Sequence, residues 1–429
     1  MIAPSIATSR TDDDAMLGRL QRAAFEYFLR NANAQNGLIA DTTREGAPSS
    51  IAVVGFALSA YPVGVEHGWI DRADAAGRTL VTLQFFMDSD QSGAPTATGH
   101  RGFYFHFLDM HSGTRVWLSE LSLIDTALLM AGVLTAAAYF TAETPAEVEL
   151  RRLADALYRR VDWRWAQSDG SAVMHGWKPE CGFLHYGWEG YSEAILLYVL
   201  GLGSPTHPLT EQSFLDWTVT YQWENLYGID FLYAGPLFIH EFSHVWIDFR
   251  GIQDRFMREK DCDYFENSRR ATYVQREYAM RNPRSFTGYS ADCWGLSAGD
   301  GPSAEPRLVA GRRQAFYGYA ARGVPYGPDD GTIAGPATLS SLVFAPEIAL
   351  PALRRITARG PGNADDSSLR ASGFNPTVGW VSEGSFGLDQ GMIVLMIENY
   401  RCGLLWQLGR DNPFVRAGLR RAGFSGGWL

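Results

Sequence analysis

The sequence predicts an all-α fold in which two concentric rings of helices form a single domain over residues 1–429. Apolar residues recur at helical spacing through most of the chain, whereas the strict alternation of a β-strand is scarce. Several helical segments are apolar on nearly every side, so other helices must surround them. A toroid with an inner and an outer ring meets this requirement, and 429 residues with 46% hydrophobic content can fill its core. A superhelical repeat protein is the alternative, but no fixed period is evident in the sequence.

The predicted helices are separated by long connections rich in glycine, proline and aspartate, such as residues 88–102 and 323–337. A short helix is also expected over residues 236–250, between a Gly-Pro pair and an Arg-Gly pair. The other predicted helices cover residues 14–32, 49–68, 119–140, 147–166, 191–203, 339–360 and 389–409.

The first fifteen residues, MIAPSIATSRTDDDA, carry little helical periodicity, and we expect residues 1–15 to form a flexible N-terminal extension. This start lacks the basic region and the long apolar core of a secretory signal. We therefore expect a cytoplasmic location, or a periplasmic or secreted one if a leader has been removed. No apolar run reaches the length of a membrane span, so no membrane partner is expected.

Charge and aromatic content indicate a carbohydrate partner and argue against a nucleic acid. The formal net charge is −10, whereas nucleic-acid binding usually needs a basic face. Aromatic residues reach 13%, and many stand beside acids, as in HYGWEGYSEA and YQWENLYG. Such rings suit the C–H faces of sugars, while carboxylates accept hydrogen bonds from their hydroxyls. An aromatic-rich core is the alternative interpretation for any single ring.

Glu193 is the acid that the pattern singles out first. It stands at the start of an apolar helix, on the side that carries the core-facing leucines, and Trp188 and Tyr191 precede it. A carboxyl group walled by aromatic rings has its charged form destabilised and its pKa raised, as a general acid requires. The alternative is a helix-capping acid that acts together with Ser192.

Other acids also mark the starts of apolar helices. Ser119 is a plausible N-cap, which would put Glu120 in the first turn, where complementing the helix dipole is the alternative to a functional role. Asp125 lies on an apolar face, at a cost on the order of several kcal/mol unless it is paired or solvated; a structural ion pair with an arginine is its alternative. Asp389 opens the last long helix, where N-capping is the alternative. If these helices form the inner ring, the acids converge on one cleft, as glycoside hydrolysis requires.

Many ordered blocks of the sequence resemble the bacterial glycoamylase-like family, which includes endo-β-1,2-glucanases of glycoside hydrolase family 144. The blocks include GLIADTT, GFYFHFLDM, ELSLIDTALLMAGVL, WEGYSEAILLYVLGLG, HEFSHVWIDFRGIQD, WGLSAGDGP and LDQGMIVLMIENYR, and the resemblance runs from about residue 20 to 410. It implies an (α/α)6 toroid that hydrolyses β-linked glucan, above all β-1,2-glucan or its oligosaccharides. No cofactor and no metal are expected.

The resemblance also implies roles for single residues. Glu193, in the GYSEA block, becomes the proton donor, while Glu120 and Asp125, in ELSLIDTA, become active-site acids that supply the base or nucleophile, with inversion favoured. The chain departs from the family pattern at Met392, where proline is expected, and at Gly299, where a bulkier residue is frequent; both changes are expected near the cleft. A β-1,2-glucan transglycosylase and an exo-acting, sophorose-releasing hydrolase stay open as alternatives. Candidate sugar contacts are Asp41, His106, Trp177, Tyr191, His244, Asp300 and Asp389.

The segment from His240 to His244 reads HEFSH and matches the HExxH pattern, in which two histidines bind zinc and the glutamate activates water. A zinc metallopeptidase built on His240, Glu241 and His244 is therefore a distant alternative. Such a site needs a third ligand, and the extended HExxHxxGxxH pattern fails here. Glu266 follows at a workable spacing, but arginines close behind it could pair with it instead. The resembling family often has glutamine in place of Glu241, and glutamine is no base, so we expect an ordinary helix of the toroid.

Overall fold

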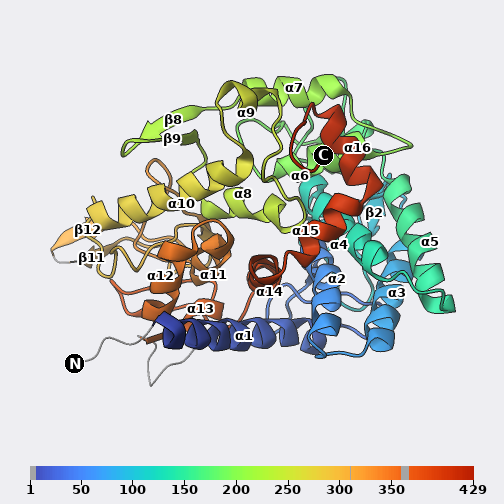
Figure 1. Cartoon of the computed structure of the whole chain (residues 1–429). Helices are drawn as coiled ribbons and strands as arrows, with labels where there is room; N and C mark the ends of the chain where they lie inside the picture. Colours follow the sequence, from blue (N-terminus) through green and yellow to red (C-terminus); the bar gives the residue numbers. More distant parts are fainter. Residues whose placement is uncertain (1–5, 310, 359–366) are drawn as a thin grey trace.

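Six helical segments, each apolar over most of its surface, form the inner ring of the molecule (Figure 1). The computed structural model describes residues 6–309, 311–358 and 367–429. Each inner segment contacts the next, and the last contacts the first, so the ring is closed. The predicted all-α toroid is thereby confirmed. The inner segments are α2 (Ile51–Glu66), α4 (Leu123–Tyr139), α6 (Ala194–Gly203), α8 (Leu237–Glu241) continued by η2 (Phe242–Val245), α11 (Gly335–Ser340) continued by η3 (Ser341–Val343), and α14 (Gly387–Arg401).

The helices that alternate with these along the chain form the outer layer. α1 lies along one edge of the molecule beside α14, α3 and α5 pack on each other and on α2 and α4, and α10 and α12 cover α8 and α11 (Figure 1). The C-terminal α16 packs against α6. The outer and additional helices are α1 (Ile6–Arg30), α3 (Arg72–Asp88), α5 (Pro145–Arg160), α7 (Glu211–Val219), α9 (Arg255–Glu259), α10 (Tyr264–Arg281), α12 (Pro346–Ala358), α13 (Ser367–Arg370), α15 (Leu404–Asp411), α16 (Pro413–Arg421) and the single turn η1 (Trp165–Gln167).

Short strands lie in the connections and fix where the inner helices begin. β1 ends directly before α2, and β5 ends directly before α4. A five-stranded antiparallel sheet has the order β2 (Gly99–His100), β3 (Phe103–Phe105), β5 (Leu121–Ser122), β6 (Gly176–Lys178), β7 (Gly182–Phe183). The remaining antiparallel pairs are β1 (Ser49–Ser50) with β4 (Phe107–Leu108), β8 (Trp223–Leu226) with β9 (Ile229–Leu232), β10 (Ala298–Gly299) with β13 (Ala320–Ala321), β11 (Arg307–Val309) with β12 (Arg312–Gln314), and β14 (Phe374–Asn375) with β15 (Trp380–Val381).

Glycines allow the inner helices α2 and α4 to pack almost backbone to backbone. A Cβ atom on Gly132 of α4 would lie 2.1 Å from the carbonyl oxygen of Gly55 in α2. A Cβ atom on Gly55 would in turn lie 2.4 Å from the carbonyl oxygen of Leu128. Any larger residue at either position would force the two helices apart. This close approach holds the starts of both helices at one end of the ring.

The start of α4 differs from the prediction. Leu121 and Ser122 are extended, because they pair with β3 on one side and with β6 on the other. Ser122 is therefore the N-cap, and its Oγ accepts a hydrogen bond from the backbone N–H of Asp125. The expectation that Ser119 caps this helix and that Glu120 lies in its first turn is wrong. Asp125 takes the first-turn position instead.

Two predicted helices are each broken into two. The segment predicted over residues 339–360 ends at η3 and restarts at Pro346, because a residue before proline is driven out of the α region. Its residues 359–360 lie outside the described part of the chain. The segment predicted over residues 389–409 breaks between α14 and α15, where Gly403 has a φ of +70°. Only glycine adopts this left-handed conformation without strain.

The N-terminal segment is more ordered than the sequence suggests. Residues 1–5 lie outside the described part, but α1 begins at Ile6. Asp13 is only 8% exposed, and it accepts a hydrogen bond from Arg354 of α12 at 2.7 Å (Nε to Oδ1). Residues 6–15 thus belong to a helix that this ion pair joins to α12, while the flexibility expected for residues 1–15 stays a prediction.

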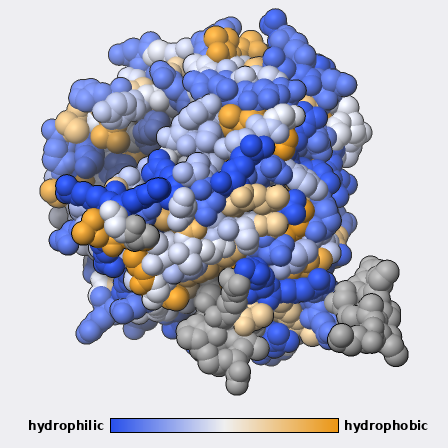
Figure 2. Space-filling model, turned by 90° about the vertical axis from the view of Figure 1, so that its left-hand side faces the viewer, coloured by the Kyte–Doolittle hydropathy of each residue, from blue (hydrophilic) through white to orange (hydrophobic). Residues whose placement is uncertain are grey.

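The face of the molecule drawn in Figure 2 is mainly hydrophilic. On the face drawn in Figure 2, apolar residues form small separate patches within a mainly hydrophilic surface, as is usual for exposed protein surfaces. None of the helices in the described ranges combines the length and the hydropathy that crossing a bilayer demands.

Candidate active site

A cavity of about 530 Å³ opens at the end of the toroid where the inner helices begin. All six inner segments contribute to its wall from their N-terminal ends. Their contributions are Ser50 before α2, Asp125 in the first turn of α4, Glu193 before α6, Phe238 in α8, Pro336 in α11 and Asp389 in the first turn of α14. The predicted convergence of acids on one cleft is therefore what this fold produces.

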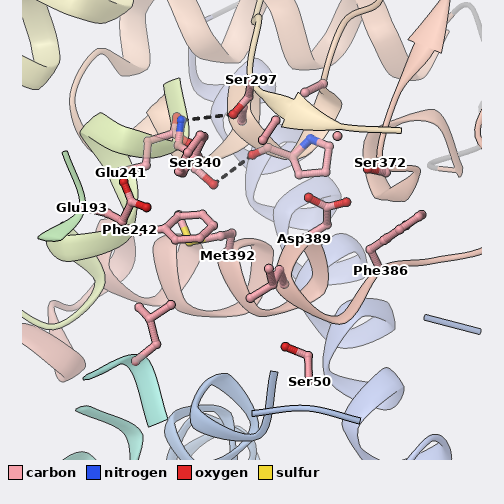
Figure 3. A pocket seen from close by; sticks show the side chains of 18 of the residues that line it. Ser50, Glu193, Glu241, Phe242, Ser297, Ser340, Ser372, Phe386, Asp389 and Met392 are labelled. Atoms are coloured by element: carbon pink, nitrogen blue, oxygen red, sulfur yellow. Dashed lines mark hydrogen bonds between the residues drawn. The ribbon is translucent and has the colours of Figure 1, made fainter. Parts of the chain in front are cut away.

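Glu193 occupies the N-cap position of α6 and lines the cavity. The hydroxyl of Ser243 donates to its backbone carbonyl oxygen at 2.9 Å, which ties the start of α6 to η2. Burial, together with the negative charge of Asp125, raises the pKa of Glu193 to about 7. Figure 3 shows Glu193 beside the ring of Phe242. The structure thus puts a carboxyl group that holds its proton near neutral pH at the cavity wall.

His106 lies between two carboxylates in the same wall. Its Nδ1 is 2.8 Å from Oε1 of Glu120, and its Nε2 is 3.5 Å from Oδ2 of Asp125. Burial alone would lower the pKa of His106, but the charges of Asp125 and Glu120 raise it to about 9. The imidazole is therefore a cation at neutral pH, and its hydrogen bond holds the pKa of Glu120 below its ordinary value. The hydroxyl of Ser122 donates a further hydrogen bond to Oδ2 of Asp125 at 2.5 Å.

Asp389 and Asp41 form a second acidic pair, on another side of the cavity from Glu193 (Figure 3 for Asp389). Burial raises the pKa of Asp389 to about 7, and the charge of Asp41 adds to the effect. Among the described residues, Oδ2 of Asp389 is buried without a hydrogen-bond partner. Burial also raises the pKa of Asp41 to about 6, although His106 opposes the shift. Both carboxyl groups of this pair therefore lose their protons at a higher pH than an ordinary aspartate does.

The structure brings five predicted site residues to the cavity wall and leaves five outside it. Glu193, Asp125, Asp41, His106 and Asp389 line the cavity. Glu120 lies outside the wall and contacts His106, which lines it; its catalytic role stays a prediction. The others outside the wall are Trp177, Tyr191, His244 and Asp300.

Packing explains why these four side chains do not reach the cavity. Trp177 of β6 stacks on His100, with ring centroids 5.1 Å apart. Tyr191 is buried against Tyr264, with ring centroids 5.6 Å apart. Asp300 pairs with Arg44 and accepts a hydrogen bond from Ser382 at 2.8 Å, so it ties three loops together at the rim. His244 is fully buried, and its Nε2 lies 3.0 Å from Oγ of Ser268 in α10.

The HEFSH segment does not form a metallopeptidase site. Helix α8 ends at Glu241 and a 3-10 turn follows, so the two histidines do not share one face of a continuous α-helix. His240 donates through Nε2 to the carbonyl oxygen of Ala234 at 3.2 Å. Glu266, the suggested third ligand, pairs with Arg270 at 3.0 Å. The zinc-peptidase interpretation is therefore wrong for this motif.

Sequence reasoning did not assign several residues of the cavity. Glu241 is buried in the wall and accepts a hydrogen bond from Ser341 at 3.0 Å, whereas the sequence indicated only an ordinary helix of the toroid around it. Tyr319 lies in a connection without periodicity, so no pattern could indicate it. Met392 and Gly299, where the chain departs from the family pattern, both line the cavity as expected. The other serine and phenylalanine residues of the wall, which were also not assigned, are Ser50, Phe107, Phe238, Phe242, Ser297, Ser340, Ser372 and Phe386.

The chain is similar in sequence and structure to proteins named as glucoamylases or as β-1,2-glucan-cleaving enzymes. A family model described as "Putative glucoamylase" matches residues 185–413. The exo β-1,2-glucooligosaccharide sophorohydrolase (non-reducing end) of Parabacteroides distasonis is 26% identical over 97% of this chain, which spans 59% of that relative's length. A crystal structure from Bacteroides uniformis with the same description as the family model is 30% identical, with a TM-score of 0.86 over 97% of this chain and 98% of that one. The endo-β-1,2-glucanase of Chitinophaga pinensis, solved with sophorotriose and glucose, is 26% identical, with a TM-score of 0.82 over 97% and 99% of the two chains.

Proposed function

Since the chain belongs to the glycoamylase family, we propose that it hydrolyses β-1,2-glucan or its oligosaccharides. Two similar proteins are named for this linkage, one as an endo-acting glucanase and one as a sophorose-releasing hydrolase. The observation that carries the proposal is the pairing of Glu193 with Asp125 in one cavity. Their environments differ, because burial favours the protonated form of Glu193 whereas a cation and a hydroxyl face Asp125. Two carboxyl groups in such contrasting environments suit glycoside hydrolysis, which needs both an acid and a base.

Glu193 acts as the general acid in this proposal. With a pKa of about 7 it still carries its proton at mildly acidic pH. It donates that proton to the glycosidic oxygen as the bond from this oxygen to C1 breaks, so the departing sugar leaves as a neutral alcohol. Its place at the start of α6 also puts the partial positive charge of the helix near the carboxylate that remains.

Asp125 acts as the general base. It takes a proton from a water molecule, and the resulting hydroxide attacks C1 on the face opposite the leaving oxygen, which inverts the anomeric configuration. His106 and Ser122 stabilise the negative charge that Asp125 needs for this step. Glu120 holds the imidazole of His106 in place and is a positioning residue, since it lies outside the cavity wall.

The second candidate is exo-acting release of sophorose, which the name of the Parabacteroides distasonis relative favours. The same carboxylates serve either mode of attack, and they also serve transfer of a glucosyl group to another sugar. Product analysis separates the three. A ladder of lengths indicates endo action, sophorose alone indicates exo action, and redistribution of lengths without new reducing ends indicates transfer.

The decisive experiment incubates the protein with linear β-1,2-, β-1,3- and β-1,4-glucans and counts new reducing ends. We expect cleavage of the β-1,2-linked chain. Glu193→Gln keeps the shape of the side chain but has no proton to give, so its kcat should fall by roughly 10²- to 10⁴-fold. An activated aryl glycoside that the wild type cleaves should restore part of the rate, because its leaving group needs no proton. Near wild-type activity of Glu193→Gln on the glucan would refute the assignment.

A further inference from the structure

Tyr319 stands out among the residues of the cavity because most of its side chain is uncovered. It is 67% exposed, and within the described residues it is the one large side chain of the wall with such exposure. The other aromatic wall residues, such as Phe242 and Phe386, are partly covered by their neighbours. An aromatic ring that lines a cavity yet remains uncovered presents a free surface to whatever enters.

Tyr319 shares the cavity wall with four acids from four segments of the chain, Asp389, Asp41, Asp125 and Glu193. Desolvation and the negative charges of these acids raise the pKa of Tyr319 above its ordinary value. Its hydroxyl therefore keeps its proton at every pH at which the enzyme works and can act as a hydrogen-bond donor.

A buried arginine fixes the turn that carries Tyr319. Arg322 is 1% exposed and pairs with Asp330, with Nε to Oδ1 at 2.8 Å and Nη2 to Oδ2 at 2.9 Å. Its Nη2 also donates to the carbonyl oxygens of Tyr317 and Gly318 at 3.2 and 3.0 Å, directly before Tyr319. The next residue belongs to β13, which pairs with β10 at the cavity wall. Both sides of Tyr319 are therefore anchored.

The guanidinium group of Arg322 also holds β10, the strand that pairs with β13. Nη1 of Arg322 donates to the carbonyl oxygens of Gly299 and Asp300 at 3.0 and 3.2 Å. A Cβ atom on Gly301 would fall 2.0 Å from Nη2, so a side chain at that position would displace the arginine. A side chain presented from so fixed a turn loses little conformational freedom on binding, which favours affinity.

We propose that Tyr319 is a substrate-contacting residue, whose ring packs on the C–H face of the sugar unit at the cleavage point and whose hydroxyl donates to that unit. The inference rests on the proposed function, because it takes the ligand to be a neutral β-linked glucan. A tyrosine combines an apolar face with one polar tip, which matches a sugar ring and its hydroxyls. Because Tyr319 lines the same cavity as Glu193 and Asp125, we assign it to the sugar unit on which these acids act.

The test compares Tyr319→Ala and Tyr319→Phe with the wild type on β-1,2-glucooligosaccharides. Removing the ring should raise KM by roughly tenfold or more, since it removes apolar surface that the sugar would cover. Tyr319→Phe keeps the ring and loses one hydrogen bond, so its KM should rise by roughly two- to tenfold. The affinity for sophorotriose, measured by calorimetry in a Glu193→Gln background, should fall more for Tyr319→Ala than for Tyr319→Phe.

The matched control is Tyr326→Ala. Tyr326 is 68% exposed in the same connection but packs on Tyr233, with ring centroids 5.5 Å apart, outside the cavity wall. Its KM should stay within about twofold of wild type, and thermal unfolding should be unchanged in all three variants because these side chains are mostly exposed. If Tyr319→Ala has the KM and the sophorotriose affinity of the Tyr326→Ala control, the inference is overturned. The proposed function is tested independently, by measuring whether the unmodified protein cleaves β-1,2-glucan.

Discussion

Nδ1 of His106 lies 2.8 Å from Oε1 of Glu120, and this contact determines which cavity acid faces a positive charge. The two residues come from different connections, His106 from between β3 and β4 and Glu120 from before β5. Glu120 accepts through its side chain while its backbone carbonyl accepts the N–H of His106 at 2.9 Å. Glu120 therefore holds both the backbone and the ring of His106, with the second ring nitrogen directed at Asp125. The arrangement resembles a catalytic base oriented by a supporting carboxylate, in which each member needs the next.

Replacing Glu120 by glutamine should weaken catalysis without blocking substrate binding. The amide can still contact His106, but the charge of one of the three acids that raise the pKa of His106 to about 9 is lost. We expect kcat at pH 6 to fall roughly ten- to a hundredfold with KM within about threefold, because the side chain lies outside the cavity wall.

Titration of the His106 ring by nuclear magnetic resonance gives the readout that a purely structural role would not move. The His106 pKa should fall in Glu120→Gln, with the signal assigned by its absence in a His106→Gln variant. Glu143→Gln is the control, because Glu143 forms only an exposed ion pair with Arg151. An unaltered His106 pKa in Glu120→Gln would show that the contact with Glu120 does not stabilise the charged imidazole.

The pH dependence of kcat/KM should fall on the alkaline side with an apparent pKa near 7. Glu193 must be protonated to act, and the pKa that burial raises to about 7 means that its proton is lost as the pH rises through this value. Above pH 8 the rate should drop about tenfold for each pH unit. The residual activity of Glu193→Gln on an activated aryl glycoside should lack this descending limb. A wild-type profile that stays flat to pH 9 would exclude Glu193 as the acid.

Glu193, Asp125 and Asp389 could be predicted from the sequence because the signal was local. Glu193 and Asp389 are acids at the start of an otherwise apolar helix, and Asp125 is an acid on an apolar helix face; the ring closure of the fold then brings them together. The all-α class could be predicted from the helical spacing of apolar residues along the chain. Helix boundaries were less predictable, since the pairing of Leu121 and Ser122 with strands far along the chain decides where α4 begins.

The sugar contacts were harder to predict because exposure is a tertiary property. Trp177, Tyr191 and His244 have the right chemistry, yet each is covered by aromatic or polar neighbours from other segments. The same reasoning could not find Tyr319, whose position depends on a buried arginine that gathers carbonyl groups from two connections. Residue type alone does not tell a covered ring from an open one.

Prolonged dialysis against a chelator should leave kcat/KM on β-1,2-glucan within about twofold. Among the described residues, the ligand-type atoms of His106, Glu120 and Asp125 lie within 4.8 Å of one another, a spacing that a metal ion could also use. Here both ring nitrogens of His106 already face a carboxylate, and a charged imidazole has no lone pair to offer an ion. Zinc added back at micromolar concentration should not raise the rate. Loss of activity on dialysis with recovery on adding metal would contradict this interpretation of the cluster.

Breaking the buried pair of Arg322 and Asp330 should destabilise the protein far more than breaking a surface pair. Asp330→Asn leaves a fully buried guanidinium without its counter-ion, which costs roughly 3–5 kcal/mol in the free energy of unfolding. Asp155→Asn, which removes the exposed partner of Arg159 on α5, should cost less than about 1 kcal/mol.

The stabilisation by the Arg322–Asp330 pair should depend on pH. Although burial opposes the shift, the hydrogen bonds from Arg322 hold the pKa of Asp330 below its ordinary value of 3.8. The carboxylate therefore stabilises the fold above about pH 4, and this contribution is lost as the pH falls through the lowered pKa. Denaturant unfolding at pH 7 should show the large difference between the two variants, and the gap between wild type and Asp330→Asn should narrow towards pH 3. Equal losses in the two variants at pH 7 would mean that the pair contributes no more than a surface contact.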